Sequence, residues 1–121
     1  MRIWFQKHIT VGKVPALDAG YEKHAKQLVR PDTEIVFHGM QKEAYAGNFP
    51  DQMVNYCFPE AMFTNYFLSR VIEAEKSGYD AFIIGTAPDP GLREAKTLVD
   101  IPVVGYSEIS MHIACMLGTH F

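Results

Sequence analysis

The stretch that decides the fold lies in the second half of the chain: Ala81-Phe82-Ile83-Ile84-Gly85, then, after a short turn, Asp89-Pro90-Gly91. A continuous apolar run of this kind is typical of a parallel strand that is covered on both faces. An aspartate followed by a proline predicts the start of a helix, with Asp89 as the cap and Pro90 in the first turn. The stretch therefore predicts a strand followed by a helix, which is the repeating unit of a parallel α/β fold.

The same alternation extends in both directions from this stretch. Short apolar runs predict further strands at residues 2–6, 34–39 and 101–105. Helical spacing and stop signals predict helices over Pro15 to Leu28, Glu60 to Ser77, 89–99 and Ser107 to Leu117, with a long loop over 40–59. This order predicts one α/β domain over residues 1–121, a flavodoxin-like parallel sheet of four strands in the order 2-1-3-4 with helices on both faces.

Composition and charge exclude several broad classes of function. The chain has 121 residues, of which 48% are hydrophobic and 21% charged, so it can bury a core. The net charge of −3 argues against broad binding to nucleic acid or to an anionic membrane. No apolar run approaches the ~18 residues of a membrane span. Cys57 and Cys115 form neither a disulfide framework nor a metal-ligand spacing, so we expect a cytoplasmic protein.

The expected strand order predicts where a ligand would bind. In an open parallel sheet, ligands bind beyond the carboxyl ends of the strands, near the point where the strand order reverses. With the order 2-1-3-4, this point lies between the first and the third strand. The segments that follow the strands there are Gln6-Lys7-His8, Gly85 to Asp89 and Tyr106-Ser107-Glu108. We expect these three loops to converge on a candidate site.

Side chains in these loops can bind an anion. The hydroxyl of Thr86 and the backbone N–H groups beside it, next to a helix N-terminus, can form a cradle for a carboxylate. Tyr106 would point its hydroxyl toward the same crevice, and Lys7 and His8 could neutralise the bound charge. Each feature also has a structural explanation: the loop can be a simple turn, the tyrosine can be packed, and the lysine can be solvated.

Other residues offer weaker sites. The histidines at 24, 38, 112 and 120 lack partners at metal-ligand spacing, so we expect no metal. His112 and Cys115 lie in an apolar helix, which predicts a packed or interface histidine and a small core cysteine. The chain has no glycine-rich phosphate or dinucleotide motif, which leaves a flavin- or nucleotide-binding domain as a weak alternative.

Two motifs in the second half resemble those of the aspartate/glutamate/hydantoin racemase family. They are Asp89-Pro90-Gly91-Leu92 and the run from Val99 to Gly105, which is followed by Ser107-Glu108. The opening Ile3-Trp4-Phe5-Gln6 is similar to one branch of that family. The resemblance runs from the first strand to residue 121. It implies a fold of two pseudo-symmetric lobes with the active site between them, of which this chain would be the N-terminal lobe.

The resemblance also implies an activity. Racemases of this family need no cofactor, and a thiol from each lobe acts on opposite faces of the carbon next to a carboxylate or a hydantoin carbonyl. Here Thr86 occupies the usual position of the first-lobe cysteine. Gly85-Thr86 and Tyr106 are similar to the carboxylate-binding positions of arylmalonate-decarboxylase-like members, which use one thiol from the second lobe. The resemblance thus implies a racemase-type isomerase, with a decarboxylase-like lyase as the alternative.

Two hypotheses follow from these residues. In the first, the chain is one lobe of such an enzyme: Thr86, the Ala87 amide and Tyr106 bind the anion, Lys7 lies beside it, Gln6 orients a small carboxylate or hydantoin-type substrate, and the thiol comes from a second lobe. In the second, the chain is a catalytically silent carboxylate-binding module that forms a homo-oligomer. Its last predicted helix is apolar around its circumference, and such a helix needs burial on more than one side.

Overall fold

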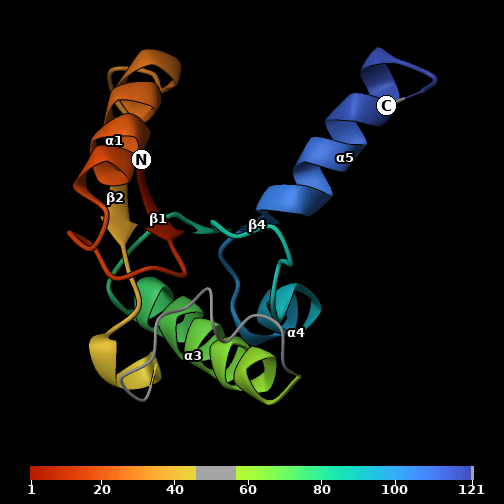
Figure 1. Ribbon diagram of the computed structural model, residues 1–121. Coiled ribbons are helices and arrows are strands. Elements are labelled where there is room, and N and C mark those ends of the chain that lie inside the picture. The colour runs from red at the N-terminus through yellow and green to blue at the C-terminus, as the bar shows by residue number, and fades with distance from the viewer. Residues whose placement is uncertain (46–56, 121) are drawn as a thin grey trace.

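The computed structural model of the protein describes residues 1–45 and 57–120 and confirms the α/β fold. The elements are β1 (Arg2–Gln6), α1 (Pro15–Leu28), β2 (Glu34–His38), the 3-10 helix η1 (Lys42–Tyr45), α3 (Cys57–Lys76), β3 (Ala81–Ile84), α4 (Leu92–Leu98), β4 (Val103–Gly105) and α5 (Tyr106–Leu117). The strands form one parallel sheet in the predicted order β2-β1-β3-β4. Figure 1 shows the course of the chain through these elements.

β1 is a central strand and sets the register of the sheet. Its residue Trp4 pairs with Val36 of β2 on one side and with Phe82 of β3 on the other. All pairings are parallel, so every strand has its carboxyl end at the same edge of the sheet. That edge is where the candidate site was expected.

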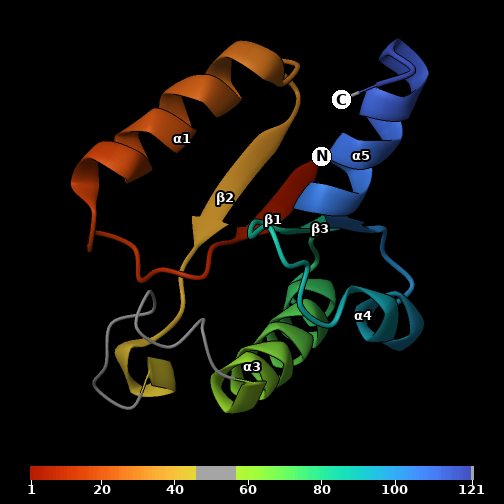
Figure 2. The ribbon, with the colours of Figure 1, turned by 45° about the vertical axis from the view of Figure 1, so that its right-hand side comes forward.

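The hydrophobic core lies between the sheet and helices α3 and α4. Figure 2 shows these two helices together on one side of the sheet. The predicted helical spacing in α3 is confirmed, because every fourth or third residue of one stripe is buried. The buried side chains that fill this layer include Trp4, Phe63, Phe67, Val71, Ala74, Phe82, Ile84, Leu92, Ala95 and Val103.

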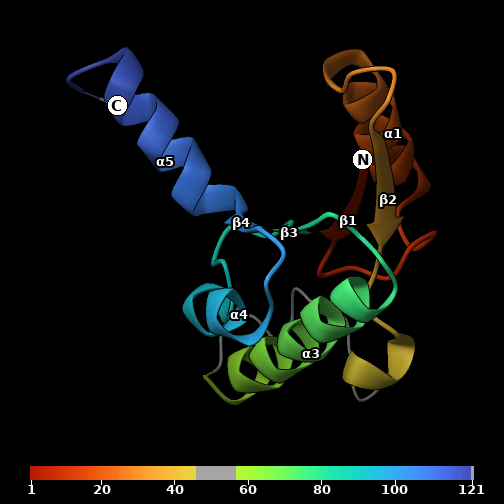
Figure 3. The same cartoon turned by 180° about the vertical axis from the view of Figure 1, so that it is seen from behind.

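The opposite face of the sheet is covered much less completely. α1 and α5 both lie on that side and diverge from one another, as Figure 3 shows from behind, and neither helix has a buried residue. Ile83 of β3 and Val104 of β4 point to this face and are only half-buried. The prediction of helices on both faces is therefore confirmed, but the strand at 81–85 is only partly covered on this side.

α5 shows the consequence of this arrangement. Its large apolar side chains remain accessible to solvent: Tyr106 (52% exposed), Ile109 (43%), Met111 (56%), Ile113 (44%), Met116 (77%) and Leu117 (83%). Cys115 is also exposed, so its prediction as a core residue is wrong, because the helix that carries it does not pack. None of the helices within the described residues has the length and apolar character needed to cross a membrane.

Three helix starts differ from the prediction, and for α5 the difference is a single residue, because the helix begins at Tyr106 and not at Ser107. α3 begins at Cys57, which was expected in the loop before the helix. α4 begins at Leu92, because Asp89 (φ 46°) and Gly91 (φ 69°) adopt left-handed backbone conformations that cannot continue a helix. Residues 46–56 of the expected long loop lie outside the described residues.

Truncation of a core side chain should measure how much the layer between the sheet and helices α3 and α4 contributes to the free energy of unfolding. Phe82 is completely buried, so Phe82→Ala should lower the free energy of unfolding by about 3–5 kcal/mol in urea unfolding experiments. Leu28→Ala is the matched control, because Leu28 is 70% exposed at the end of α1. Its effect should stay within about 0.5 kcal/mol. Equal losses in both variants would contradict a core confined to the α3 side.

Candidate functional site

The loops predicted to form the site start side by side at the carboxyl edge of the sheet. Gln6 at the end of β1 pairs with Ile84 of β3, which pairs in turn with Gly105 of β4. The backbone N–H of Gly85 also donates a hydrogen bond to the Gln6 carbonyl, at 2.8 Å. The segments that follow these three strands are therefore neighbours from their first residues onward.

The loop after β3 is a tight turn that lies close to β1. A methyl group at Gly85 would collide with the ring of Phe5, so the glycine leaves the space that this ring occupies. The Asp89 N–H donates to the Thr86 carbonyl at 3.1 Å and closes the turn. Thr86 is half-buried and Ala87 is exposed, so this turn is at least partly accessible to solvent.

The Asp89 side chain caps α5 rather than its own helix. Its two carboxylate oxygens accept hydrogen bonds from the N–H groups of Ser107 (3.1 Å) and Glu108 (2.7 Å) in the first turn of α5. The predicted capping roles of Asp89 and Ser107 are therefore wrong. The Ser107 hydroxyl donates to the carbonyl of Ala87, and no side-chain cap bonds to α4. A carboxylate at a helix N-terminus satisfies free N–H groups and interacts favourably with the helix dipole.

Tyr106 is the first residue of α5 and is about half exposed. Burial raises the pKa of Tyr21 in α1, and the Tyr106 phenol raises it further. The Tyr21 ring packs against Phe5 and Phe37 on the same face of the sheet, with ring centroids 5.5 and 5.9 Å apart. Tyr21 and its two aromatic neighbours thus lie on the sheet face that carries α1 and α5, and Tyr106 begins the second of these helices.

Gln6 is completely buried on the α3 side of the sheet. Its side-chain oxygen accepts a hydrogen bond from the indole N–H of Trp4 at 3.0 Å, and its amide nitrogen donates to the Lys7 carbonyl at 2.9 Å. Both ends of the amide are thus engaged inside the protein. The structure does not bring this side chain into the solvent-exposed part of the site with Thr86 and Tyr106.

Lys7 is buried as well, with 3% of its surface exposed, so the alternative that it is solvated is wrong. Its ammonium group forms an ion pair with Asp18 of α1, and the other oxygen of Asp18 accepts the Gly12 N–H at 2.6 Å. The hydrogen bond from Lys7 holds the pKa of the Asp18 carboxyl below its usual value. The charge of Lys7 is therefore balanced by the protein itself. Burial also lowers the pKa of the neighbouring His8, which favours its neutral form.

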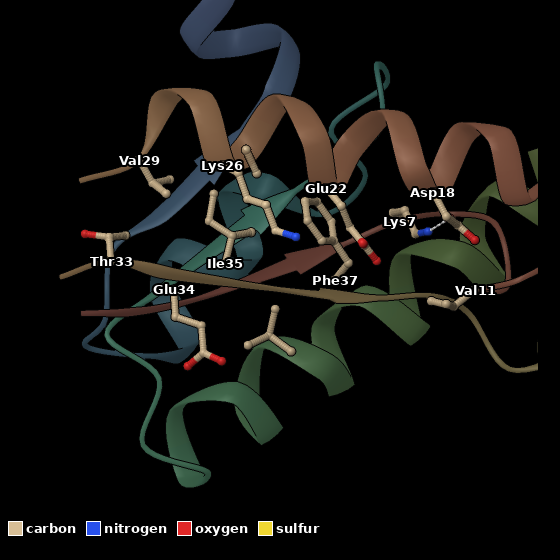
Figure 4. Close-up of a pocket in the computed structure, with 12 residues that line it drawn as sticks. Lys7, Val11, Asp18, Glu22, Lys26, Val29, Thr33, Glu34, Ile35 and Phe37 are labelled. Carbon is tan, nitrogen blue, oxygen red and sulfur yellow. Dashed lines mark hydrogen bonds and ion pairs between the residues drawn. The ribbon is translucent and has the colours of Figure 1, made fainter. Parts of the chain in front are cut away.

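Two grooves flank the β2 edge of the sheet. The first, of about 450 Å³, runs between α1 and β2. Figure 4 shows the Lys7–Asp18 pair at one end of it. The second, of about 460 Å³, lies on the α3 side and is lined by Arg2, His38 and Arg70 among others. Neither groove is lined by Thr86, Ala87 or Tyr106. Over residues 1–45 and 57–120, no group of three or more metal-type ligands comes together.

Comparison with known proteins identifies relatives, although no protein-family model matches the chain. A hydantoin racemase from Pseudomonas sp. (strain NS671) is 32% identical over 106 residues, which are 88% of this chain and 40% of the relative. A hydantoin racemase from Paenarthrobacter aurescens is 37% identical over 65 residues, which are 53% of this chain and 28% of the relative.

The fold also matches a solved structure. Allantoin racemase from Klebsiella pneumoniae superposes with a TM-score of 0.74 at 26% identity, covering 96% of this chain and 43% of that one. The chain therefore spans less than half the length of the racemases that it matches.

The buried ion pair beside the site predicts a specific effect on stability. Asp18→Asn leaves the Lys7 charge buried without a counter-ion, which should lower the free energy of unfolding at neutral pH by about 3–5 kcal/mol. Because the pKa of Asp18 is lowered in the folded state, its contribution is present above the ordinary value of 3.8 and is lost as the pH falls through the folded pKa. Urea unfolding of both proteins at several pH values should show the difference between them shrinking in acid.

The control for this experiment is Asp32→Asn. Asp32 pairs with Arg30 at 2.9 Å, but both side chains are largely exposed, so the loss should not exceed about 1 kcal/mol. If Asp18→Asn costs no more than this control, Lys7 is not held by the pair in solution.

Proposed function

We propose a racemase function for this chain, which belongs to the aspartate/glutamate/hydantoin racemase family: it forms one lobe of a cofactor-independent enzyme that inverts the carbon next to a carboxylate or a hydantoin carbonyl. The observation that carries the proposal is the likeness to hydantoin and allantoin racemases over nearly the whole chain. The convergence of the predicted loops at the carboxyl edge of the sheet supports it further.

The reaction needs groups that transfer protons and groups that donate hydrogen bonds to the intermediate. This chain offers the hydrogen-bond donors. Removal of the proton beside a carbonyl needs a base, return of a proton needs an acid, and the enolate formed between these steps needs hydrogen-bond donors. Thr86, the Ala87 amide and Tyr106 can act as such donors, since Thr86 is half-buried and the other two residues are exposed. In the proposed enzyme they bind the substrate anion and stabilise the charge that develops on its oxygen.

The buried neighbours of these donors act indirectly in this proposal. Gln6 fixes the end of β1 through its bond to the Lys7 carbonyl, and Lys7 fixes the following loop to α1 through Asp18. Both residues thereby hold the backbone at the end of β1, next to the proposed substrate site. They contribute to orientation through the backbone rather than by direct contact.

The base is assigned to a part of the enzyme outside this chain. A thiol, with an ordinary pKa of ~8.5, can be ionised near neutral pH, whereas the hydroxyl of Thr86 is a far weaker acid. The position of Thr86 also favours a second candidate, a decarboxylase-like reaction. In that reaction the bond to a carboxylate breaks, CO₂ leaves, the electron pair forms an enolate held by these donors, and a single thiol returns the proton.

Substitution of Thr86 tests its assigned role. Thr86→Ala in the protein that carries this chain should lower kcat/KM for racemisation of a hydantoin by at least about tenfold, because a hydrogen bond to a charged group contributes ~1.5–3 kcal/mol. Thr86→Ser keeps the hydroxyl and should retain most of the activity. Thr86→Cys supplies a thiol. It should change the ratio of two rates, the racemisation of a hydantoin and the decarboxylation of an arylmalonate. Unchanged rates in the Ala and Cys variants would remove Thr86 from the site.

The exposed apolar surface of α5 favours the alternative of a non-catalytic, carboxylate-binding dimer. A contiguous apolar patch larger than a few hundred Å² is uncommon on monomers and marks an interaction site. In this alternative, a second copy of the chain covers Ile109, Ile113 and Met116.

Sedimentation of this chain distinguishes the alternative. If the dimer forms through α5, Met116→Glu should convert it to a folded monomer, because Met116 is 77% exposed and would place a charge in the interface. Leu98→Glu is the control, since Leu98 is an exposed apolar residue of α4 on the other side of the sheet. A folded monomer of the unsubstituted chain would count against the dimeric module.

A further inference from the structure

We infer that Asp89 is a positioning residue of the proposed anion site: its carboxylate holds the start of α5, and with it Tyr106, against the turn that carries Thr86 and Ala87. The inference depends on the proposed function for the identity of the site. The coupling itself rests on the contacts of Asp89.

These contacts join the two sides of the site directly. The Asp89 carboxylate accepts the N–H groups of Ser107 and Glu108, which are the two residues immediately after Tyr106. The hydroxyl of Ser107 donates in the opposite direction, to the carbonyl of Ala87. The turn after β3 and the first turn of α5 are thus connected in both directions, and the position of Tyr106 relative to Thr86 follows from this connection.

Within this chain, apolar packing contributes little to the position of α5. The helix has no buried residue, and its polar contacts with the rest of the chain cluster at its first turn. One more contact there is the ion pair between Glu108 and Lys96 of α4, at 2.6 Å, with both side chains about 40% exposed. Because an exposed pair of this kind contributes little, the capping contacts of Asp89 are the main polar constraint that this chain itself places on the start of α5.

The position of the Asp89 carboxylate depends on Gly105, the glycine that ends the run from Val99 to Gly105. A Cβ atom at Gly105 would lie 2.7 Å from the carboxyl carbon of Asp89 and 2.6 Å from the Leu92 side chain. Asp89 also has a left-handed backbone, which aspartate tolerates better than most residues. The structure therefore gives one physical reason for two separate motifs: the aspartate of Asp89-Pro90-Gly91-Leu92 packs on the glycine that ends the run from Val99 to Gly105.

Asp89 acts through α5 rather than on the substrate. Both of its oxygens already accept backbone N–H groups. Its negative charge is compensated by the N-terminus of α5, and this end of the helix is therefore occupied by the protein itself rather than by a ligand.

The test is a double-substitution cycle in the protein that carries this chain, with racemisation of benzylhydantoin as the assay. Asp89→Asn replaces one accepting oxygen by an amide NH₂, so it should raise KM by about tenfold with a much smaller change in kcat. Tyr106→Phe should also raise KM. If Asp89 acts by placing Tyr106, the double variant should be no worse than Asp89→Asn alone, because residues that act through one another are not additive.

A second variant reaches the same contact from the other side. Gly105→Ala keeps the carboxylate but displaces it, and it should reproduce the rise in KM and the loss of additivity. It also serves as the test if Asp89→Asn does not fold. The matched control is Glu108→Gln, which removes the ion pair with Lys96 in the same turn of α5 but leaves the cap, and it should leave KM unchanged.

The outcomes separate this inference from the proposed function. If Tyr106→Phe raises KM but Asp89→Asn and Gly105→Ala do not, the positioning role is wrong and the proposed site stands. The same holds if the rise in KM from Tyr106→Phe multiplies with the rise from either of the other two substitutions. If Thr86→Ala and Tyr106→Phe both leave KM unchanged, or if no racemisation occurs, the proposed site is wrong and this inference is overturned with it.

Discussion

The packing of the sheet on α3 is the interaction on which the rest of the structure depends. Trp4, Phe82 and Phe67 form a layer in which each side chain is almost completely buried. Apolar burial of this kind supplies most of the stability of a small domain, and here it is concentrated on one face of the sheet. The two helices on the other face, α1 and α5, have no completely buried residue, although the Tyr21 ring of α1 packs against Phe5 and Phe37. Polar contacts at the carboxyl edge of the strands therefore add to this limited packing.

Each of these two helices is attached at that edge by a carboxylate. Asp18 of α1 binds the buried ammonium group of Lys7, and Asp89 accepts the first N–H groups of α5. Hydrogen bonds to charged groups are stronger than neutral ones and have defined directions. They can therefore help to orient α1 and α5, whose side chains are only partly packed. The edge of the sheet at which the candidate site lies is in this way also the edge at which both helices are attached. This arrangement explains why polar residues gather there even though several of them are buried.

Much of the fold could be predicted from local pattern. The limits of α1, the apolar stripe of α3 and the order of the strands follow from periodicity, from Pro15 and from the β-α alternation. The site could be predicted only as a set of loops. Nothing in the spacing of Lys7 and Asp18, eleven residues apart, indicated that they pair. Similarly, Asp89 followed by proline indicated a cap for the next helix, whereas its side chain caps the helix after that.

The sequence by itself determined the class of the fold, the order of its strands and the edge of the sheet where chemistry can occur, because these depend on the hydrophobic period and on chain connectivity. Only the tertiary structure decided which polar groups face solvent and which are used internally. Gln6 and Lys7 are buried and engaged, whereas Ala87 and Tyr106 remain open and Thr86 is half-buried. The physical reason is that hydrogen-bond partners and burial depend on contacts between segments far apart in the chain, and local pattern does not encode these.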